Sequence, residues 1–304
     1  MTPRGRYLLV AGVFVIAAVI WWRGGVVAML PVDLQYIHCL VLDGQLKRAR
    51  ANPSALDRLW LGLRSRRVEQ TYRRFLDRHP DHAPARVAYG NFLADEDREA
   101  AALREWEAAL AADPRSAVAH NNLGQHLIHR GQIAEGLEHL EQAMALEPQA
   151  AVYYYTWASA MFAYRQDTKR KYGWDTDEIT ERALAAFRKA RDLAPQDFTY
   201  SNAYAEMFYF TPRPNWEEAY AAWRFCLNQP LDELDRERTC GRLARVCMHL
   251  RRFDEAARWL AEMKSEPSRG FREALERKRL ALLNGAVDES PALNWMRAVS
   301  DPAR

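Results

Sequence analysis

The chain has 304 residues, which suits one large or two ordinary domains, and a hydrophobic content of 49% argues against disorder over its whole length. Its 43 basic and 40 acidic side chains leave a net charge of +3, so composition gives no indication of a nucleic-acid partner. Glycine and proline, at 14 each, are few enough to favour an all-α chain of long helices joined by short turns.

An apolar segment lies close to the amino terminus. Residues 7–22 are uncharged and largely aliphatic, and a second apolar stretch extends the segment to residue 30 with Arg23 as its only charge. A bilayer core requires about 20 apolar residues, so residues 7–30 are long enough to cross it. Trp21 and Trp22 suit the membrane interface, where Arg23 could extend to the headgroups. We therefore expect residues 7–30 to form a transmembrane signal anchor.

The charges around this segment predict its orientation. Arg4 and Arg6, in the short segment 1–6, should stay in the cytoplasm under the positive-inside rule, which places the rest of the chain on the periplasmic or extracytoplasmic side. Two alternatives remain: a signal peptide cleaved after Ala28, or a buried helix of a soluble protein. Residues 31–64 would follow as a membrane-proximal connecting region, whose irregular apolar pattern indicates a helix only weakly.

A repeat of fixed length follows this region. Pro80, Pro114 and Pro148 are 34 residues apart, and the intervening residues align when the prolines are superimposed. A period of this size is typical of a solenoid, in which each repeat buries its apolar face against the next. Proline cannot continue a helix, so each of these prolines should begin a connection between repeats.

The unit from residue 117 to residue 150 shows how its two helices would pack. Gly124 and Ala143 are small where the helices should cross closely, while Leu123, Leu127 and Leu140 are large enough to fill the space between them. This unit resembles the tetratricopeptide repeat (TPR) nearly position by position, with Gly136 in place of the usual alanine. The resemblance implies a right-handed α-solenoid built from helical hairpins.

The TPR resemblance covers residues 65–285 and gives about five hairpins. The third of them is 13 residues too long, which indicates an insertion near residues 166–177. Residues 67–80 look like the second helix of an earlier repeat whose first helix is degenerate, because Asn52 and Pro53 lie where that helix should begin. Residues 271–283 could close the stack as its terminal helix. We expect residues 286–304 to be a loosely ordered tail.

The sequence lacks the common motifs of catalytic and metal-binding sites. It contains no glycine-rich phosphate loop, no serine nucleophile elbow and no histidine pair with metalloprotease spacing. The four cysteines form no CxxC pair, so we expect buried thiols and neither a zinc site nor a redox motif; they are Cys39, Cys226, Cys240 and Cys247. We therefore expect a protein that is not an enzyme and that needs no cofactor or metal.

The TPR resemblance implies a concave groove lined mainly by the first helix of each hairpin. The corresponding positions in this chain are Asn91, Asn121, Gln125, His129, Tyr155, Ser159, Phe162, Asn202, Glu206 and Tyr209. Amide side chains can hydrogen-bond to a peptide backbone, and aromatic side chains can anchor apolar residues. The alternative for each position is an ordinary amphipathic helix face.

The insertion contains a basic and aromatic cluster that could form an accessory loop. Its residues are Lys169, Arg170, Lys171 and Trp174. Such a cluster could contact lipid headgroups or an acidic partner, whereas a solvated loop is the alternative.

Together these features predict a membrane-anchored scaffold or assembly adaptor that docks a partner protein or peptide, expected to be another envelope protein, in its groove. One alternative is an exported scaffold released by cleavage of the apolar segment. Another is an enzyme whose site is concealed in the irregular repeats.

Overall fold

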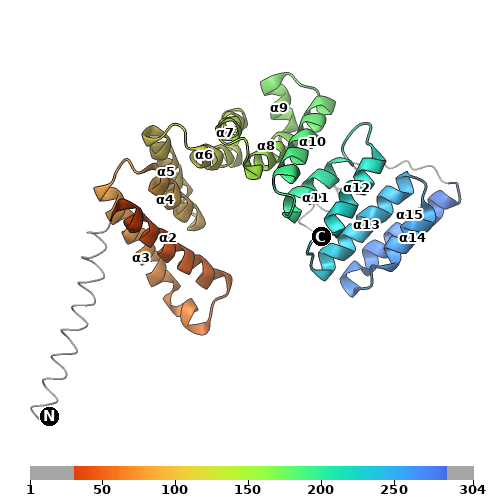
Figure 1. Cartoon of the computed structure of the whole chain (residues 1–304), viewed down its shortest axis with the longest axis horizontal. Helices are drawn as coiled ribbons and strands as arrows, with labels where there is room; N and C mark the ends of the chain where they lie inside the picture. The colour runs from red at the N-terminus through yellow and green to blue at the C-terminus, as the bar shows by residue number, and fades with distance from the viewer. Residues whose placement is uncertain (1–30, 286–304) are drawn as a thin grey trace, which may run out of the picture. The chain divides into compact units, whose positions relative to one another are not determined.

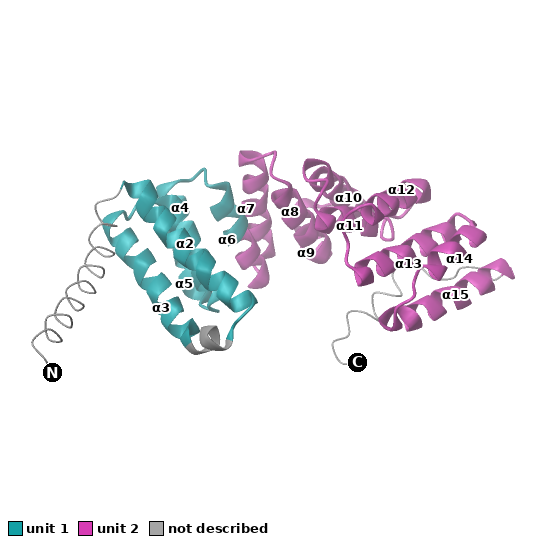
Figure 2. Ribbon diagram, turned by 60° about the horizontal axis from the view of Figure 1, so that its bottom comes forward, with its two compact units in different colours: residues 1–123 teal, residues 124–304 magenta. Residues whose placement is uncertain are grey.

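A computed structural model of the protein describes residues 31–285 (Figure 1). The expected anchor at residues 7–30 and the expected tail at residues 286–304 lie outside the described residues. Every regular element of residues 31–285 is a helix, and none of these helices is both long and apolar enough to cross a membrane. Two compact units, residues 1–123 and 124–304, divide within helix α6 (Figure 2).

The first unit contains two helical hairpins and the beginning of α6. Its helices are α2 (Val32–Ala51), α3 (Ala55–Arg78), α4 (Ala83–Asp95), α5 (Glu99–Ala112) and the first half of α6 (Ala117–His129).

The second unit continues the same pattern to the end of the described chain. After the second half of α6 come α7 (Ile133–Leu146), α8 (Ala151–Ala163), α9 (Arg165–Tyr172), α10 (Thr176–Leu193), α11 (Phe198–Met207), α12 (Trp216–Leu227), α13 (Glu233–His249), α14 (Phe253–Ala261), the 3-10 turn η1 (Glu266–Ser268) and α15 (Arg269–Leu283).

The observed hairpins confirm the repeat predicted from the sequence. The first helices of three successive repeats begin 34 residues apart, at Ala83, Ala117 and Ala151. The five predicted hairpins correspond to α4–α5, α6–α7, α8–α10, α11–α12 and α13–α14. The described chain is therefore an all-α helical repeat structure.

Polar caps explain why four helices of the second unit begin where they do. The side chains of Asp175, Asp197, Asn215 and Asp232 each accept a hydrogen bond from a backbone N–H in the first turn of the helix that follows, at 2.7 to 3.2 Å. Such caps satisfy N–H groups that have no partner within the helix, and each typically stabilises a helix by about 1 kcal/mol. The sequence thus fixes the starts of α10, α11, α12 and α13 locally.

Two glycines allow α6 and α7 to cross closely within the second unit. A Cβ atom added to Gly124 would lie 2.8 Å from the carbonyl oxygen of Gly136, and one added to Gly136 would lie 2.6 Å from the carbonyl oxygen of Gly124. Leu137 and Leu140 of α7 are fully buried beside this crossing. Gly136, which departs from the usual TPR residue, therefore brings the two backbones closer than an alanine would permit.

We predict that Gly124→Ala lowers the free energy of unfolding by about 1–3 kcal/mol, because its new methyl group would meet backbone rather than a movable side chain. Gly270→Ala is the matched control, since a Cβ built at Gly270 in α15 would have no atom within 4 Å apart from its chain neighbours and the backbone of its own helix. The control should be neutral or slightly stabilising, because alanine favours a helix over glycine. Urea unfolding of both proteins measures the difference, and equal midpoints would contradict this crossing.

Residues 31–64 were expected to be a connecting region that contains only a degenerate first helix, and the structure differs. They form the complete helix α2 and the first part of α3, which pair as an additional hairpin. Asn52 and Pro53 lie in the turn between these helices, where proline is tolerated, and not at the start of a helix. Tyr72 and Phe75 of α3 are buried, and Tyr72 stacks on Tyr89 of α4 with 5.5 Å between ring centroids. The first unit therefore has one more hairpin than predicted.

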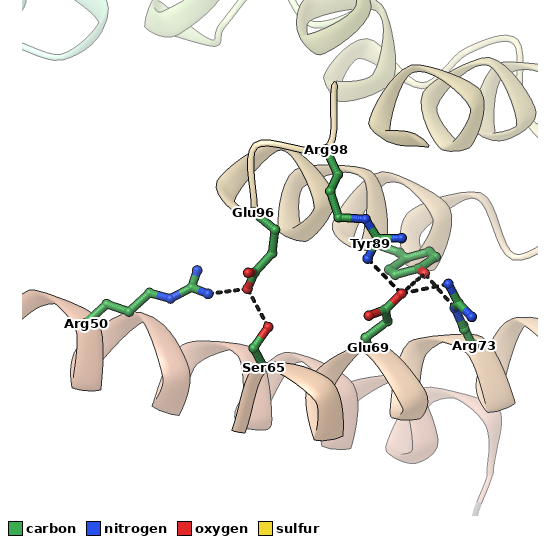
Figure 3. A network of polar contacts seen from close by, with 7 residues as sticks. All are labelled: Arg50, Ser65, Glu69, Arg73, Tyr89, Glu96 and Arg98. Atoms are coloured by element: carbon green, nitrogen blue, oxygen red, sulfur yellow. Dashed lines mark hydrogen bonds and ion pairs between the residues drawn. The ribbon is translucent and has the colours of Figure 1, made fainter. Parts of the chain in front are cut away.

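A polar network also joins this additional hairpin to α4 and α5. Arg50 and Ser65 both bond to the carboxylate of Glu96, while Arg73 and Arg98 both pair with Glu69 (Figure 3). Burial favours the neutral form of Glu69, but the hydrogen bond from Arg98 and the nearby guanidinium charges lower its pKa overall. Half-exposed ion pairs contribute little to stability, so this network fixes the register of the hairpins more than it stabilises them.

The predicted insertion near residues 166–177 is mostly a helix and not a loop. Helix α9 follows α8 directly and is capped at its carboxyl end by Gly173, whose φ of 77° suits glycine. Thr168 of α9 is fully buried, and its hydroxyl donates hydrogen bonds to the carbonyl oxygens of Met161 and Tyr164. The inserted residues are thus packed onto the repeat that contains them.

A buried carboxylate joins α13 to the connection between α14 and α15. Glu237 of α13 is 4% exposed and accepts hydrogen bonds from the backbone N–H groups of Lys264 and Ser265 at 2.7 and 2.8 Å. Its other oxygen accepts a hydrogen bond from the Ser265 hydroxyl. Burial alone would raise the pKa of Glu237, but hydrogen bonds from Ser265, Ser268 and these backbone groups outweigh it and lower the pKa to about 2. Glu237 therefore positions the connection that leads into α15.

We predict that Glu237→Gln lowers the free energy of unfolding by about 1–3 kcal/mol at neutral pH, because hydrogen bonds to a charged acceptor are replaced by weaker ones. The folded-state pKa is depressed, so this stabilisation should be complete above the unfolded pKa of about 4.3 and should disappear as the pH falls towards 2. Unfolding measured from pH 7 down to pH 2 should show the two proteins converging in acid. A constant difference would contradict the charged state assigned to Glu237.

Candidate functional site

The predicted groove residues of the first unit lie in a network of amide side chains. Asn91 of α4 is half-buried, and its Oδ1 atom accepts hydrogen bonds from Trp106 Nε1 at 3.0 Å and from Asn122 Nδ2 at 2.6 Å. Asn121 is only 6% exposed and donates to Asn122 Oδ1 at 3.4 Å. The expectation that Asn121 is accessible is therefore wrong, because the second asparagine, Asn122, takes the outward position. Asn91 retains its amide N–H groups as donors.

Two predicted groove residues lie on the second half of α6. Gln125 is half-buried and His129 is exposed at the end of the helix. Neither side chain forms a hydrogen bond with another part of residues 31–285, so both are open to a ligand.

In the second unit, two predicted groove residues of α8 form aromatic pairs with residues of the following repeat. Tyr155 lies against Tyr200 with ring centroids 5.3 Å apart, and Phe162 lies edge-to-face on Phe210 at 5.0 Å. All four rings are half-buried, so one side of each pair is accessible to solvent. Edge-to-face and offset aromatic pairs leave ring faces on which an apolar side chain can pack.

Polar side chains lie on the same two helices. Ser159 and Asn202 are half-buried, and neither forms a side-chain hydrogen bond within the described chain. Glu206 of α11 forms an ion pair with Arg242 of α13. This pair connects the first helices of the last two hairpins. We call the surface formed by Tyr155, Ser159, Phe162, Asn202, Glu206, Tyr200, Phe210 and Arg242 the first-helix face of the second unit.

Tyr209 belongs to the core and not to this surface, in contrast to the expectation from the sequence. It is 1% exposed, and its hydroxyl donates a hydrogen bond to the backbone carbonyl of Arg242 at 3.0 Å. Burial raises the pKa of Tyr209, so its hydroxyl stays protonated and can keep this bond. Arg245 lies over the outer side of its ring at 4.5 Å. The helix ends at Met207, and the turn that follows directs Tyr209 inward.

Sequence reasoning missed four residues that contribute to this surface or lie beside it: Tyr200, Phe210, Arg242 and Arg245. The arginines could have been found, because Arg238, Arg242 and Arg245 recur at helical spacing along α13. Phe210 could not, since it lies after the end of α11, in the irregular connection to α12.

The basic residues predicted as an accessory loop mostly have partners on α9 and α7. Lys171 pairs with Glu138 at 2.5 Å, and this hydrogen bond lowers the pKa of Glu138. Arg170 pairs with Asp167 within α9 at 3.0 Å. Only Lys169 is exposed without an ionic partner in the described residues.

Trp174 completes a stack beside α9. Its ring lies on that of Tyr172 at 4.2 Å, and the guanidinium of Arg182 lies 4.0 Å from its centroid. Tyr172 in turn donates a hydrogen bond to Glu141 of α7 at 2.7 Å. These contacts give α9 a packing role, while Arg170 and Lys171 also line a cavity of about 480 Å³ beside the turn that precedes α7.

No metal site is apparent in residues 31–285, where no group of three histidine, cysteine or acidic side chains could hold an ion. The first-helix face instead offers aromatic surfaces, hydrogen-bonding groups and guanidinium groups. This combination of groups is chemically suited to contact with a peptide segment.

Comparison with known proteins locates the fold. No family model and no curated protein matches the chain. Among solved structures, Pseudomonas aeruginosa PilF is 17% identical with a TM-score of 0.59, covering 81% of this chain and 99% of its own. YrrB, a TPR protein with an unusual peptide-binding site, is 13% identical with a TM-score of 0.54, covering 68% of this chain and 97% of its own.

A third solved structure gives the same result. PilW, a type IV pilus biogenesis factor, is 13% identical with a TM-score of 0.53, covering 78% of this chain and 98% of its own. Together these structures show that the described chain has a TPR-like fold.

The different positions of Tyr209 and Asn202 lead to a prediction. Tyr209→Phe should lower the free energy of unfolding by about 1 kcal/mol, because the buried carbonyl of Arg242 loses its hydroxyl donor. Asn202→Ala should change it by less than about 0.5 kcal/mol, since its half-buried side chain has no partner to lose. Thermal unfolding of both variants checks this, and a larger loss for Asn202→Ala would show that its side chain is part of the packing.

Proposed function

We propose that the protein is a membrane-anchored scaffold or assembly adaptor that binds a peptide segment of another envelope protein on the first-helix face of its second unit. The observation that supports this most is the pair of half-buried polar side chains, Ser159 and Asn202, which have no partner in the described chain and lie on the helices that carry the aromatic pairs. Because solvent reaches both side chains, a peptide can exchange hydrogen bonds with them without first breaking a side-chain bond within the described fold.

The chemistry of the face indicates what the peptide should contain. Peptide N–H and C=O groups can exchange hydrogen bonds with Ser159 and Asn202, and apolar side chains can pack on Phe162 and Phe210. Arg242 already pairs with Glu206, so an acidic group of the ligand would have to compete with this carboxylate. We therefore propose an extended peptide with aromatic or aliphatic residues. YrrB, which shares the fold, has a peptide-binding site, and this likeness is consistent with the proposal.

Attachment to a membrane is the second part of the proposal. It depends on the apolar segment 7–30, whose length and flanking charges suit a signal anchor with the repeats on the exported side. PilW, another protein of this fold, is a type IV pilus biogenesis factor, and an assembly role is the function we propose here. Cleavage of the segment would release the same binding face as a soluble exported scaffold.

Site-specific photo-crosslinking in cells tests the binding face. A photoreactive amino acid at Asn202 or Ser159 should capture the same partner, whereas one at Lys189 should not. Lys189 is the matched control because it is exposed on α10, the second helix of a hairpin, and has no ionic partner within the described residues.

A peptide from the captured partner should then bind the purified protein in a titration. Phe162→Ala should weaken this binding roughly tenfold or more, as expected for the loss of an aromatic anchor. Equal capture at Lys189 and at the two face positions, or unchanged affinity of Phe162→Ala, would show that the partner binds elsewhere.

A further inference from the structure

The additional hairpin α2–α3 has an outer side that no other described helix of the first unit covers. On α2, Leu34, Ile37, Val41, Gln45 and Arg48 recur every three or four residues and all are exposed. On α3, the exposed residues Trp60, Leu63, Arg64 and Arg67 recur in the same way. We call these nine residues the basic hairpin face.

The residues that bind α4 and α5 lie on the opposite side of the same helices. Ser65, Glu69 and Tyr72 of α3 point towards α4, as the network in Figure 3 shows for the first two of them. By helical spacing, Arg67 lies opposite these residues and Arg64 lies to one side of them, and both are exposed. Arg48 and Arg67 form no ion pair with any described residue.

The charge of this region is much higher than that of the chain. Residues 47–74 contain nine basic and two acidic side chains, a net charge of +7, whereas the whole chain carries only +3. The rest of the chain is therefore slightly acidic. A local excess of arginine next to exposed apolar residues is typical of surfaces that contact anionic lipids.

A cavity lies in the basic hairpin face between the two helices. Its volume is about 370 Å³, and its lining residues are Leu42, Gln45, Leu46, Arg48, Arg64, Arg67 and Val68. Of these, Leu46 and Val68 are buried and give the cavity an apolar floor, whereas the three arginines are exposed. Guanidinium groups around an opening can hold a phosphate through paired hydrogen bonds, and the apolar floor suits the less polar part of a lipid headgroup.

The apolar residues decide between possible occupants. Ile37, Trp60 and Leu63 are 49%, 47% and 54% exposed, respectively. Nucleic-acid phosphates would contact the arginines but would leave these apolar side chains in water. A bilayer surface would cover both, because guanidinium groups reach phosphates while apolar side chains enter the interface.

We propose that the basic hairpin face docks onto the headgroups of an anionic lipid bilayer. The proposal rests on the membrane attachment proposed above, but not on peptide binding. The expected anchor ends at residue 30, and α2 begins at Val32, so the bilayer would be close to the apolar end of this face. Helix α2 is about 30 Å long at 1.5 Å per residue, so a hairpin lying on the surface would also bring Trp60 and Leu63 into contact.

A polarity-sensitive dye on the full chain tests this contact. The dye is attached to Gln45→Cys, beside the cavity, or to Glu107→Cys, an exposed control position on α5. The native thiols should not compete, because burial raises the pKa of Cys39 and Cys240 to about 11 and that of Cys226 and Cys247 to about 12. The chain is reconstituted in vesicles of phosphatidylcholine alone or of phosphatidylcholine mixed with phosphatidylglycerol.

We expect phosphatidylglycerol to shift the emission of the dye on Gln45→Cys to the blue and to leave the dye on Glu107→Cys unchanged. About 1 M salt should abolish the shift, since it reduces the screening length to about 3 Å. Each arginine near an anionic surface contributes roughly a fivefold change in affinity, so Arg48→Glu, Arg64→Glu and Arg67→Glu together should remove the shift. The same three arginines changed to lysine should retain most of it.

A matched variant controls for net charge. It replaces three exposed arginines outside the basic hairpin face, through Arg104→Glu, Arg236→Glu and Arg277→Glu. The net charge changes by the same amount, and the emission shift should stay intact. Equal emission in both vesicle types, or equal loss in the two triple variants, would overturn the proposal. A blue shift produced by duplex DNA but not by anionic vesicles would also overturn it, in favour of a nucleic-acid surface.

The same samples separate this proposal from the proposed function. If the chain does not co-float with neutral vesicles in a flotation assay, the proposed membrane anchor is contradicted. If the chain co-floats but its dye does not respond to phosphatidylglycerol, the proposal that the basic hairpin face docks onto anionic lipid is contradicted. Peptide binding is tested only by crosslinking at Asn202 and Ser159, so it can succeed or fail independently of both.

Discussion

The close approach of two helix backbones at Gly124 and Gly136 is the constraint on which the repeat structure depends. A short helical hairpin has little apolar surface of its own, so it must bury that surface against a partner helix and then against the next hairpin. Backbones that approach this closely leave room for Leu137 and Leu140 to be fully buried beside them. The same requirement recurs through the small alanines of the other hairpins, such as Ala102, Ala109, Ala183 and Ala190, all of which are fully buried.

The residues that maintain this packing and those available for binding are distributed differently along each first helix. Tyr204, Ala205 and Phe208 of the α11 repeat are buried in the core, while Asn202 between them and the helix start remains half-exposed. The buried side chains therefore fix the orientation of the helix, and with it the direction of the exposed side chains, although the exposed side chains are not part of the core. A repeat scaffold can change its ligand in this way without changing its fold.

Much of the fold could be predicted from the sequence, because the repeat is encoded locally. The prolines spaced 34 residues apart, the small residues at helix crossings and the polar helix caps each act within one hairpin. The additional hairpin was missed because α2 has no clear apolar period and its burial depends on α3 and α4. Helix α9 was missed because a strongly basic sequence was interpreted as a loop, although Thr168 and Tyr172 provide its packing.

The binding surface was less predictable than the fold. Positions on a helix can be projected from a repeat, and Tyr155, Ser159 and Asn202 are half-buried at the projected positions. Tyr209 was not, because it lies just beyond the end of α11, where the helical projection no longer applies. Asn121 and Asn122 are adjacent, and which of them faces inward depends on a small rotation of α6 that a sequence pattern does not define.

Helix α9 has a consequence for how the second unit should unfold. In repeat proteins each hairpin usually contacts only its neighbours, so segments can open one at a time and the free energy of opening varies along the chain. Lys171 and Tyr172 connect α9 to Glu138 and Glu141 of the preceding repeat, in addition to the contacts of α8 with α7. This second connection couples two hairpins more strongly than the regular repeat does. The α7 to α10 region should therefore open as one cooperative block.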